Sequence, residues 1–201
     1  MVEFLNDHSE DITYSGLTFD LKRPTVSEFR VVETAENSAV IRIAEQSTYQ
    51  ISDGKFAWTG DLGGGGIMVQ QAIPADGKAW RVGNWDPFSS ATAEDLGDSK
   101  VRLSYTKGRC GMETGRQYQF RNTKRDVVSA LNNRCRNVTL RDCEFHALTG
   151  MGIVSQFTDG LTCQRVRVAP PEGTIRTCPA WADVFHFSGC RGRILVNECV
   201  F

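Results

Sequence analysis

A short stretch around residue 183 carries the residue types best suited to catalysis. Asp183 follows Trp181 by two residues and precedes His186 by three. A carboxyl group partly buried beside aromatic side chains can act as a general acid, and a nearby histidine can orient it or bind a hydroxyl group. The alternative is a turn aspartate that caps a corner of the chain. Spacing alone favours that alternative, so the elements that position Asp183 decide between them.

The chain lacks the patterns that metal and nucleic-acid sites require. It has three histidines and seven cysteines but no Cys-x-x-Cys or His-Glu-x-x-His sequence, which argues against zinc. Its 23 Lys and Arg residues balance 24 Asp and Glu residues, so there is no basic excess for a phosphate backbone. No apolar run approaches the roughly 20 residues of a membrane span, and no signal peptide is visible. We expect no metal or other cofactor, no nucleic-acid partner and no membrane span.

A repeated pattern predicts stacked β-strands. Each copy has apolar residues at its first, third, sixth and eighth positions, and the copies are Ile12–Phe19, Val138–Phe145, Leu161–Val168 and Ile194–Phe201. Each half alternates with the period of a strand, and the extra residue in the middle marks a corner. The copies begin 126, 23 and 33 residues apart. Such spacing is typical of a parallel β-helix, whose coils bury their inward side chains on one another. An antiparallel meander with accidental spacing is the alternative.

The repeat also predicts the state of the cysteines. Cys143 and Cys199 occupy the same inward position in two copies. We therefore expect most cysteines to be small buried residues with free thiols, with an oxidised framework as the alternative.

The long first interval predicts an insertion. Short alternating strands occur between residues 26 and 108, at Phe29–Val32, Ala39–Ile43, Ile67–Val69, Trp80–Gly83 and Val101–Tyr105. The best helix candidate, Ala91–Leu96, is only one or two turns long. We expect a first coil in 1–25, an inserted β-barrel-like domain in 26–108 and further coils in 109–201.

Three segments resemble glycoside hydrolase family 110. They are Asp11–Asp20 with the following Arg23-Pro24, Gly150–Gln156, and Ala182–Gly192, of which the last is the most specific. The resemblance covers nearly the whole chain. Members of this family are inverting exo-α-galactosidases that remove terminal α-1,3-linked galactose, including that of blood-group B antigens.

The resemblance implies an all-β chain, namely a right-handed parallel β-helix with an inserted small β-barrel or sandwich. It also implies an oligosaccharide or glycoconjugate substrate and an extracytoplasmic location, secreted or periplasmic. Asp183 occupies the place of the family's proposed general acid. The family's aspartate pair that holds water has no counterpart here, and the position stacked over Asp183 falls near 206, one coil of about 23 residues further on. We therefore expect a fragment of a longer enzyme, truncated at both ends and inactive alone.

Four residues are candidates for substrate binding, each with a structural alternative. His186 could bind a sugar hydroxyl or be structural. Gln156 follows Gly150 and Gly152, whose lack of side chains suggests close backbone approach at a ligand groove or merely at a tight corner. Arg176 could bind sugar oxygens or pair with Asp183, or it could be solvated. Trp181 could stack on a sugar face or pack internally.

Two other functions remain open. One is another β-helix enzyme, either a polygalacturonase-like hydrolase or a polysaccharide lyase. A pectate-type lyase would need an acidic calcium site, and the sequence shows no aspartate cluster. The other is a non-catalytic carbohydrate-binding or structural module, which would bind glycans without turning them over.

Overall fold

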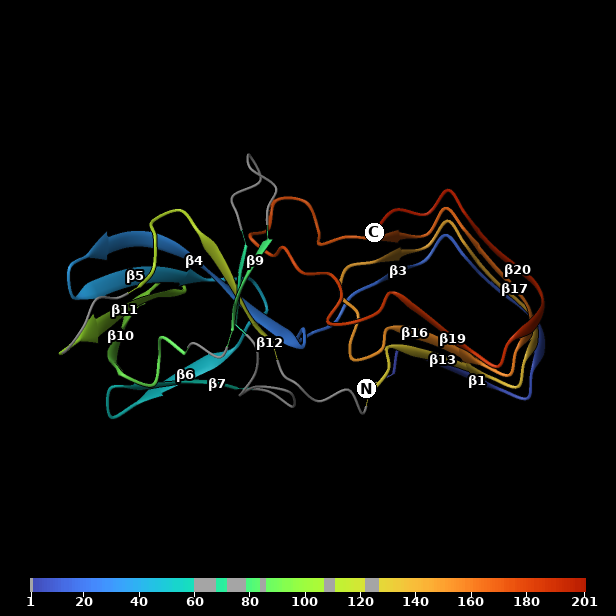
Figure 1. Cartoon of the computed structure of the whole chain (residues 1–201), viewed down its shortest axis with the longest axis horizontal. Helices are drawn as coiled ribbons and strands as arrows, with labels where there is room; N and C mark the ends of the chain where they lie inside the picture. The colour runs from blue at the N-terminus through green and yellow to red at the C-terminus, as the bar shows by residue number, and fades with distance from the viewer. Residues whose placement is uncertain (1, 60–67, 72–78, 84–85, 107–110, 122–126) are drawn as a thin grey trace. The chain divides into compact units, whose positions relative to one another are not determined.

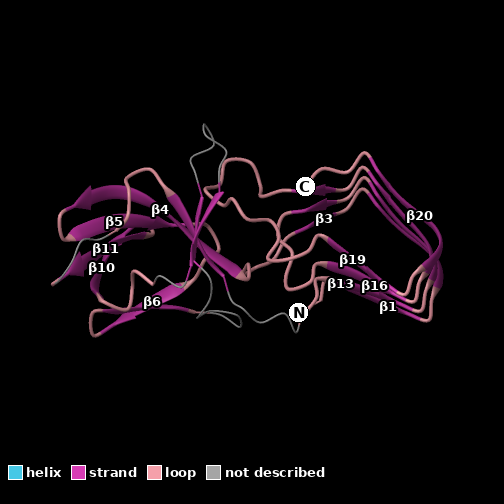
Figure 2. Cartoon of the chain, viewed as in Figure 1, coloured by secondary structure: helices cyan, strands magenta, loops and turns pink. Residues whose placement is uncertain are grey.

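The structure is a computed structural model that describes residues 2–59, 68–71, 79–83, 86–106, 111–121 and 127–201. Every regular element in these residues is a strand (Figure 2). Within them, no helix is long and apolar enough to cross a membrane. The chain divides into a β-helical unit (Met1–Pro24, Lys124–Glu172 and Cys178–Phe201) and an inserted unit (Thr25–Thr123 and Gly173–Thr177).

The β-helical unit consists of four coils whose strands form three parallel sheets (Figure 1). Sheet A pairs β1 (Phe4–Asp7), β13 (Ala130–Asn133), β16 (Ile153–Gln156) and β19 (Phe185–Ser188). Sheet B pairs β2 (Glu10–Ser15), β14 (Arg136–Arg141), β17 (Asp159–Gln164) and β20 (Arg191–Asn197). Sheet C pairs β3 (Thr18–Phe19), β15 (Glu144–Phe145) and β18 (Arg167–Val168). The coils, in order, are residues 4–19, 130–145, 153–168 and 185–201. The predicted all-β fold with parallel coils is confirmed.

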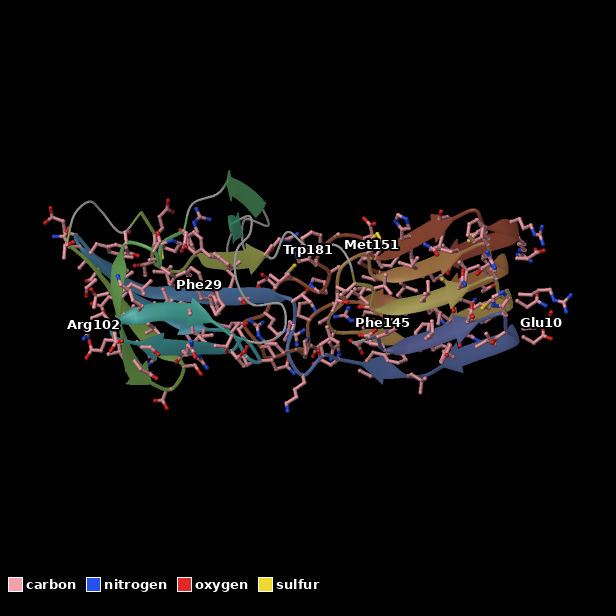
Figure 3. All side chains as sticks on the ribbon, turned by 90° about the horizontal axis from the view of Figure 1, so that it is seen from below. Glu10, Phe29, Arg102, Phe145, Met151 and Trp181 are labelled. Carbon is pink, nitrogen blue, oxygen red and sulfur yellow. The ribbon has the colours of Figure 1, made fainter. Side chains whose placement is uncertain are left out.

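The register of the sheets matches the repeat. Ile12 lies opposite Val138, Val138 opposite Leu161, and Leu161 opposite Ile194. In the middle coils these inward positions are closed to solvent, with Val138 1% and Leu161 2% exposed. Figure 3 shows the coils as layers, with Phe145 among their side chains. Each coil is therefore stabilised mainly by apolar area buried on its neighbours.

Each coil turns its corners with backbone in the left-handed region. Three columns of such residues run across the coils: His8, Arg134, Phe157 and Gly189; Asp11, Asn137, Gly160 and Gly192; Gly16, Asp142, Arg165 and Glu198. In the first column the N–H groups of His8, Arg134 and Phe157 donate to the next coil, as when the Phe157 N–H donates to the Ser188 carbonyl at 2.9 Å. L-residues other than glycine adopt this conformation only at an energetic cost. Hydrogen bonds between neighbouring coils offset that cost. The extra residue in the middle of each repeat copy is the corner residue of the third column.

Charged pairs connect the outward faces of adjacent coils. Among the described residues, oppositely charged side chains of adjacent coils form five pairs: Glu10 with Arg136, Asp142 with Arg165, Glu144 with Arg167, Asp159 with Arg191, and Arg165 with Glu198. These pairs are exposed, so each contributes little to stability. They do oppose a shift of one coil along another, because a shift would separate the paired charges.

A polar ladder lies inside the coils. The Asn6 Nδ2 donates to the Asn132 Oδ1 at 2.8 Å, and the Asn132 Nδ2 donates to the Ser155 Oγ at 3.1 Å. Asn132 and Ser155 are fully buried. A buried amide is tolerated only when its donors and acceptors are satisfied, so this ladder specifies the register of sheet A.

The cysteines of the described coils confirm the expected thiols. Cys135, Cys143 and Cys163 are buried without a disulfide, and Cys199 is half-buried. Burial and the neighbouring thiols raise the pKa of Cys163 to about 12. These residues act as small core side chains.

The inserted unit is built on a seven-stranded antiparallel sheet. Its strands, in sheet order, are β10 (Ala91–Gly97), β11 (Lys100–Tyr105), β5 (Ser38–Ile43), β4 (Val26–Ala35), β12 (Gln117–Arg121), β8 (Met68–Gln71) and β9 (Ala79–Gly83). A separate hairpin pairs β6 (Tyr49–Ser52) with β7 (Lys55–Trp58). An aromatic core that includes Phe29, Trp58 and Phe88 joins sheet and hairpin, and Figure 3 labels Phe29 within it.

Two details of the insertion differ from the sequence predictions. The unit extends beyond the predicted range 26–108, because β12 pairs with β4 and completes the sheet. The helix candidate Ala91–Leu96 is wrong, since these residues form strand β10. Ala91 and Ala93 face the core while the residues after each are exposed, which is the alternation of a strand. Of the predicted strands, Ile67 lies outside the described residues.

The inserted unit also includes residues 173–177, which the chain supplies between the third and fourth coils. The buried Glu28 carboxylate accepts hydrogen bonds from the Thr177 N–H at 2.8 Å and from the Thr177 hydroxyl. The Gln117 Nε2 donates to the Ile175 carbonyl at 2.8 Å, and the Ile175 N–H donates to Glu45. Side chains of the inserted sheet thus satisfy the backbone of a segment that forms no strand.

The polar ladder gives the first prediction. Asn132→Ala leaves the Asn6 amide and the Ser155 hydroxyl without their buried partner, so the free energy of unfolding should fall by about 2 kcal/mol. Thr162→Ala, on the outward face of β17, serves as the control and should change it by less than about 0.5 kcal/mol. Urea unfolding of both variants measures the difference. Equal stability of the two variants would contradict the proposed role of the ladder.

Glu3 gives a prediction on pH. Neither of its side-chain oxygens has a hydrogen-bond partner among the described residues, and burial together with the nearby Asp20 charge raises its pKa from 4.5 to about 8. As the pH rises, the unfolded chain loses the Glu3 proton at a lower pH than the folded chain does. The free energy of unfolding should therefore fall as pH rises from about 4.5 to about 8.

Glu3→Gln should remove this fall, and Asp20→Asn should reduce it, because each removes one member of the pair. Chemical denaturation between about pH 5 and pH 8 measures the effect. A Glu3→Gln variant whose stability depends on pH as strongly as that of the unsubstituted chain would exclude this role for Glu3.

Candidate active site

Asp183 lies just before β19, where close backbone packing determines its position. Gly152 precedes β16 in the coil beneath, with φ +66°, and a Cβ atom there would come within 2.2 Å of the Asp183 carbonyl oxygen. The Ile153 N–H donates to the Val184 carbonyl at 2.9 Å. The predicted close approach at Gly152 is therefore to the chain's own backbone, and it seats the segment that carries Asp183.

Gly150, two residues before Gly152, packs in a similar way. Its φ is +48°, and a Cβ atom there would lie 1.8 Å from the Val127 carbonyl oxygen. Both glycines thus pack backbone on backbone at the edge of sheet A. Neither contact by itself indicates a ligand.

Asp183 and His186 form a hydrogen-bonded pair. The Nδ1 of His186 lies 3.0 Å from the Oδ2 of Asp183. Their side chains are 45% and 40% exposed, so both reach solvent and could reach a substrate. The structure thus brings together two of the predicted site residues, an acidic group and a group that can orient it.

Gln156 lies on the same sheet face as His186. In sheet A, Val154 lies opposite His186 and Gln156 lies opposite Ser188. Because side chains alternate between the two faces, Gln156 and His186 are diagonal neighbours on the outward face. Gln156 is half-buried, so its amide can meet a ligand that covers this face.

The other two candidates lie elsewhere. Trp181 is 8% exposed, which leaves little of its ring for a sugar and favours the packing alternative. Arg176 belongs to the inserted unit, where it is 5% exposed and its Nη1 donates to the Gln46 Oε1. The sugar-binding roles of Trp181 and Arg176 stay predictions.

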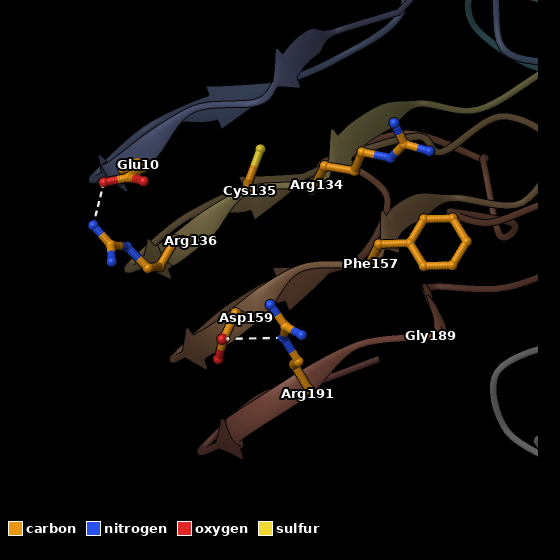
Figure 4. A pocket seen from close by; sticks show the side chains of 8 residues that line it. All are labelled: Glu10, Arg134, Cys135, Arg136, Phe157, Asp159, Gly189 and Arg191. Atoms are coloured by element: carbon orange, nitrogen blue, oxygen red, sulfur yellow. Dashed lines mark hydrogen bonds and ion pairs between the residues drawn. The ribbon is translucent and has the colours of Figure 1, made fainter.

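A groove that the sequence reasoning missed lies at the corner between sheets A and B (Figure 4). Its volume is about 620 Å³. We call it the corner groove, and it is lined by Glu10, Arg134, Cys135, Arg136, Phe157, Asp159, Gly189 and Arg191. The one signal in the sequence was an aromatic residue at a corner position, immediately after Gln156.

Phe157 is the aromatic residue among those that line the groove. It is 56% exposed, its φ is +52°, and the guanidinium carbon of Arg134 lies 5.9 Å from its ring centroid. A Cβ atom at Gly189 would approach the ring to within 2.7 Å, so glycine at this position leaves room for the ring in the orientation seen here. Figure 4 shows Phe157 between Arg134 and Gly189.

Among the residues that the structure describes, no group of three or more His, Cys, Asp or Glu side chains is arranged to hold a metal ion. In the corner groove, Arg191 pairs with Asp159 at 3.2 Å and Arg136 pairs with Glu10. These ion pairs place hydrogen-bond donors and acceptors at the rim of the groove.

Comparison with known proteins identifies relatives along nearly the whole chain. Alpha-1,3-galactosidase A of Akkermansia muciniphila is 33% identical over 96% of this chain, and the protein of that name from Bacteroides thetaiotaomicron is 29% identical over 100%. Alpha-1,3-galactosidase B of Akkermansia muciniphila is 28% identical over 100%. The matches cover 32%, 35% and 25% of these relatives, so the chain spans about a third or less of their length. No family model matches the chain.

These relatives confirm the resemblance predicted from the sequence. The identity extends over both units, including the inserted unit where the sequence motifs were least specific.

The packing at Gly152 gives a prediction with a matched control. Gly152→Ala and Gly16→Ala both place a Cβ atom at almost the same left-handed φ, +66° and +67°. At Gly16 the new atom meets no described atom within 4 Å, so the cost should be only about 1 kcal/mol of backbone strain. Gly152→Ala should cost at least about 2 kcal/mol more, because the Asp183 carbonyl must move. Thermal or urea unfolding compares the two, and equal losses would contradict the close packing.

Proposed function

Because this chain is related over nearly its whole length to the alpha-1,3-galactosidases, we propose that it forms part of a glycoside hydrolase that removes terminal α-1,3-linked galactose from glycans. The observation that supports this most is the exposed Asp183–His186 pair, placed by the β-helix on the outward edge of sheet A. The extracytoplasmic location belongs to the same proposal, since terminal galactose is displayed on exported glycans.

Asp183 is the general acid in this proposal. In its Nδ1–H tautomer, His186 donates to the Asp183 Oδ2 and holds the carboxyl group in one orientation, so the acidic proton sits on Oδ1 and faces the substrate. The proton then passes to the glycosidic oxygen as the bond to galactose breaks, so the aglycone leaves as a neutral alcohol. Gln156 binds sugar hydroxyls on the same face.

Inversion requires a second carboxylate that activates water from the opposite side of the sugar. The two carboxyl groups of inverting enzymes are about 6.5–9.5 Å apart. Neighbouring coils of a parallel sheet are about 4.8 Å apart, so a carboxylate on the adjoining coil, offset from Asp183, meets this requirement. We place the base there, one coil beyond β19.

Replacing the acid tests the proposal. In the natural protein, Asp183→Asn should reduce galactose release from an α-1,3-linked disaccharide by about 10³-fold, because the leaving oxygen is no longer protonated. Release from 2,4-dinitrophenyl α-galactoside should fall much less, since that leaving group needs no proton. Steady-state assays of both substrates measure the difference.

Asp142→Asn provides the control, because Asp142 is exposed at the corner between sheets B and C, outside the corner groove, and pairs with Arg165. It should leave both rates within about threefold of the unsubstituted enzyme. Undiminished turnover of the disaccharide by Asp183→Asn, or no galactose release by the unsubstituted protein, would refute the proposal.

A further inference from the structure

We propose that the substrate site continues from Asp183 along the outward face of sheet A into the corner groove, which binds neutral sugar residues on the aglycone side of the galactose. This inference rests on the proposed function for the galactose end and adds the substrate class, an extended uncharged oligosaccharide. Its basis is a run of outward polar residues, His186, Ser188 and Gln156, that ends at an exposed aromatic ring.

The residues of this path follow one another along two paired strands. His186 and Ser188 face outward on β19, and Gln156 lies opposite Ser188 on β16. Phe157 and Gly189 come directly after Gln156 and Ser188, and the Phe157 N–H donates to the Ser188 carbonyl at 2.9 Å. The strand that follows Asp183 therefore ends at the groove.

The length of this path determines the size of the ligand. Gly189 lies six positions after Asp183, which corresponds to about 20 Å of extended chain. A disaccharide bound at Asp183 cannot also contact Phe157. Only sugars several residues from the terminal galactose can occupy the groove.

Phe157 supplies the surface that such sugars require. Most of its ring is exposed, although a buried position would be expected for so large an apolar side chain. The apolar C–H face of a pyranose packs well on an aromatic ring, whose orientation is held here by Arg134 and the bare backbone of Gly189. An exposed ring with a defined orientation binds with a small loss of side-chain entropy.

The charges of the groove favour an uncharged ligand over an anion. Two of its three arginines are engaged by carboxylates, Arg136 by Glu10 and Arg191 by Asp159. An anionic sugar would have to compete with these carboxylates for the guanidinium groups. Paired charges at the rim still offer donors and acceptors to neutral hydroxyl groups.

The test compares two neutral glycans that share a non-reducing end, a trisaccharide and a pentasaccharide that both terminate in α-1,3-linked galactose. Calorimetric titration uses the natural protein carrying Asp183→Asn, so that neither glycan is cleaved. In that background, Phe157→Ala should weaken pentasaccharide binding about tenfold and change trisaccharide binding less than twofold. Phe157→Tyr keeps the ring and should retain pentasaccharide affinity.

Leu5→Ala is the control, since Leu5 is 63% exposed on β1 of the same sheet but outside the groove. It should affect neither glycan. The inference is overturned if Phe157→Ala weakens both glycans equally or neither, if neither glycan binds, or if a sulfated pentasaccharide binds more tightly than the neutral one. Phe157-dependent pentasaccharide binding by a protein that releases no galactose would uphold the groove and refute the proposed hydrolase.

Discussion

The stacking of left-handed corners is the constraint on which the β-helical unit depends. The corner residues lie over those of the neighbouring coil, because in two of the three columns their N–H groups donate to that coil and the sheets on both sides continue from them. A shift of one residue would turn the inward apolar side chains toward solvent and the charged ones toward the core. The buried Asn132 ladder and the paired charges between coils oppose the same shift, so three kinds of interaction specify one register.

The same register produces the candidate site. Stacking places Gly152 beneath the Asp183 backbone, which orients the strand that carries His186. It also places Phe157 over Gly189, so an exposed ring lies at the far end of the same strand pair. The acid, the polar face and the aromatic ring are therefore consequences of one packing arrangement, and the loss of either glycine would disturb the face at a different point.

Much of this arrangement could be predicted from the sequence, because a repeat in which apolar residues alternate with period two predicts both the positions of the strands and their register. The copies beginning at Ile12, Val138, Leu161 and Ile194 are paired as their spacing predicts. The limits of the inserted unit could not be predicted in this way. Its last strand and the segment around Thr177 join it through long-range hydrogen bonds, such as those to Glu28, which leave no local pattern. Phe157 was missed because a corner residue gives no periodic signal. The role of Asp183 came from the family resemblance, since its spacing alone favoured a turn.

The most direct measurement of the central claim is a crystal structure of the natural protein carrying Asp183→Asn, with a bound neutral pentasaccharide that ends in α-1,3-linked galactose. The account predicts the scissile glycosidic oxygen within hydrogen-bond distance of residue 183, a sugar hydroxyl bound by Gln156, and a distal sugar ring on Phe157. Galactose bound away from Asp183 and His186, or a glycan that leaves sheet A before it reaches the corner groove, would contradict it.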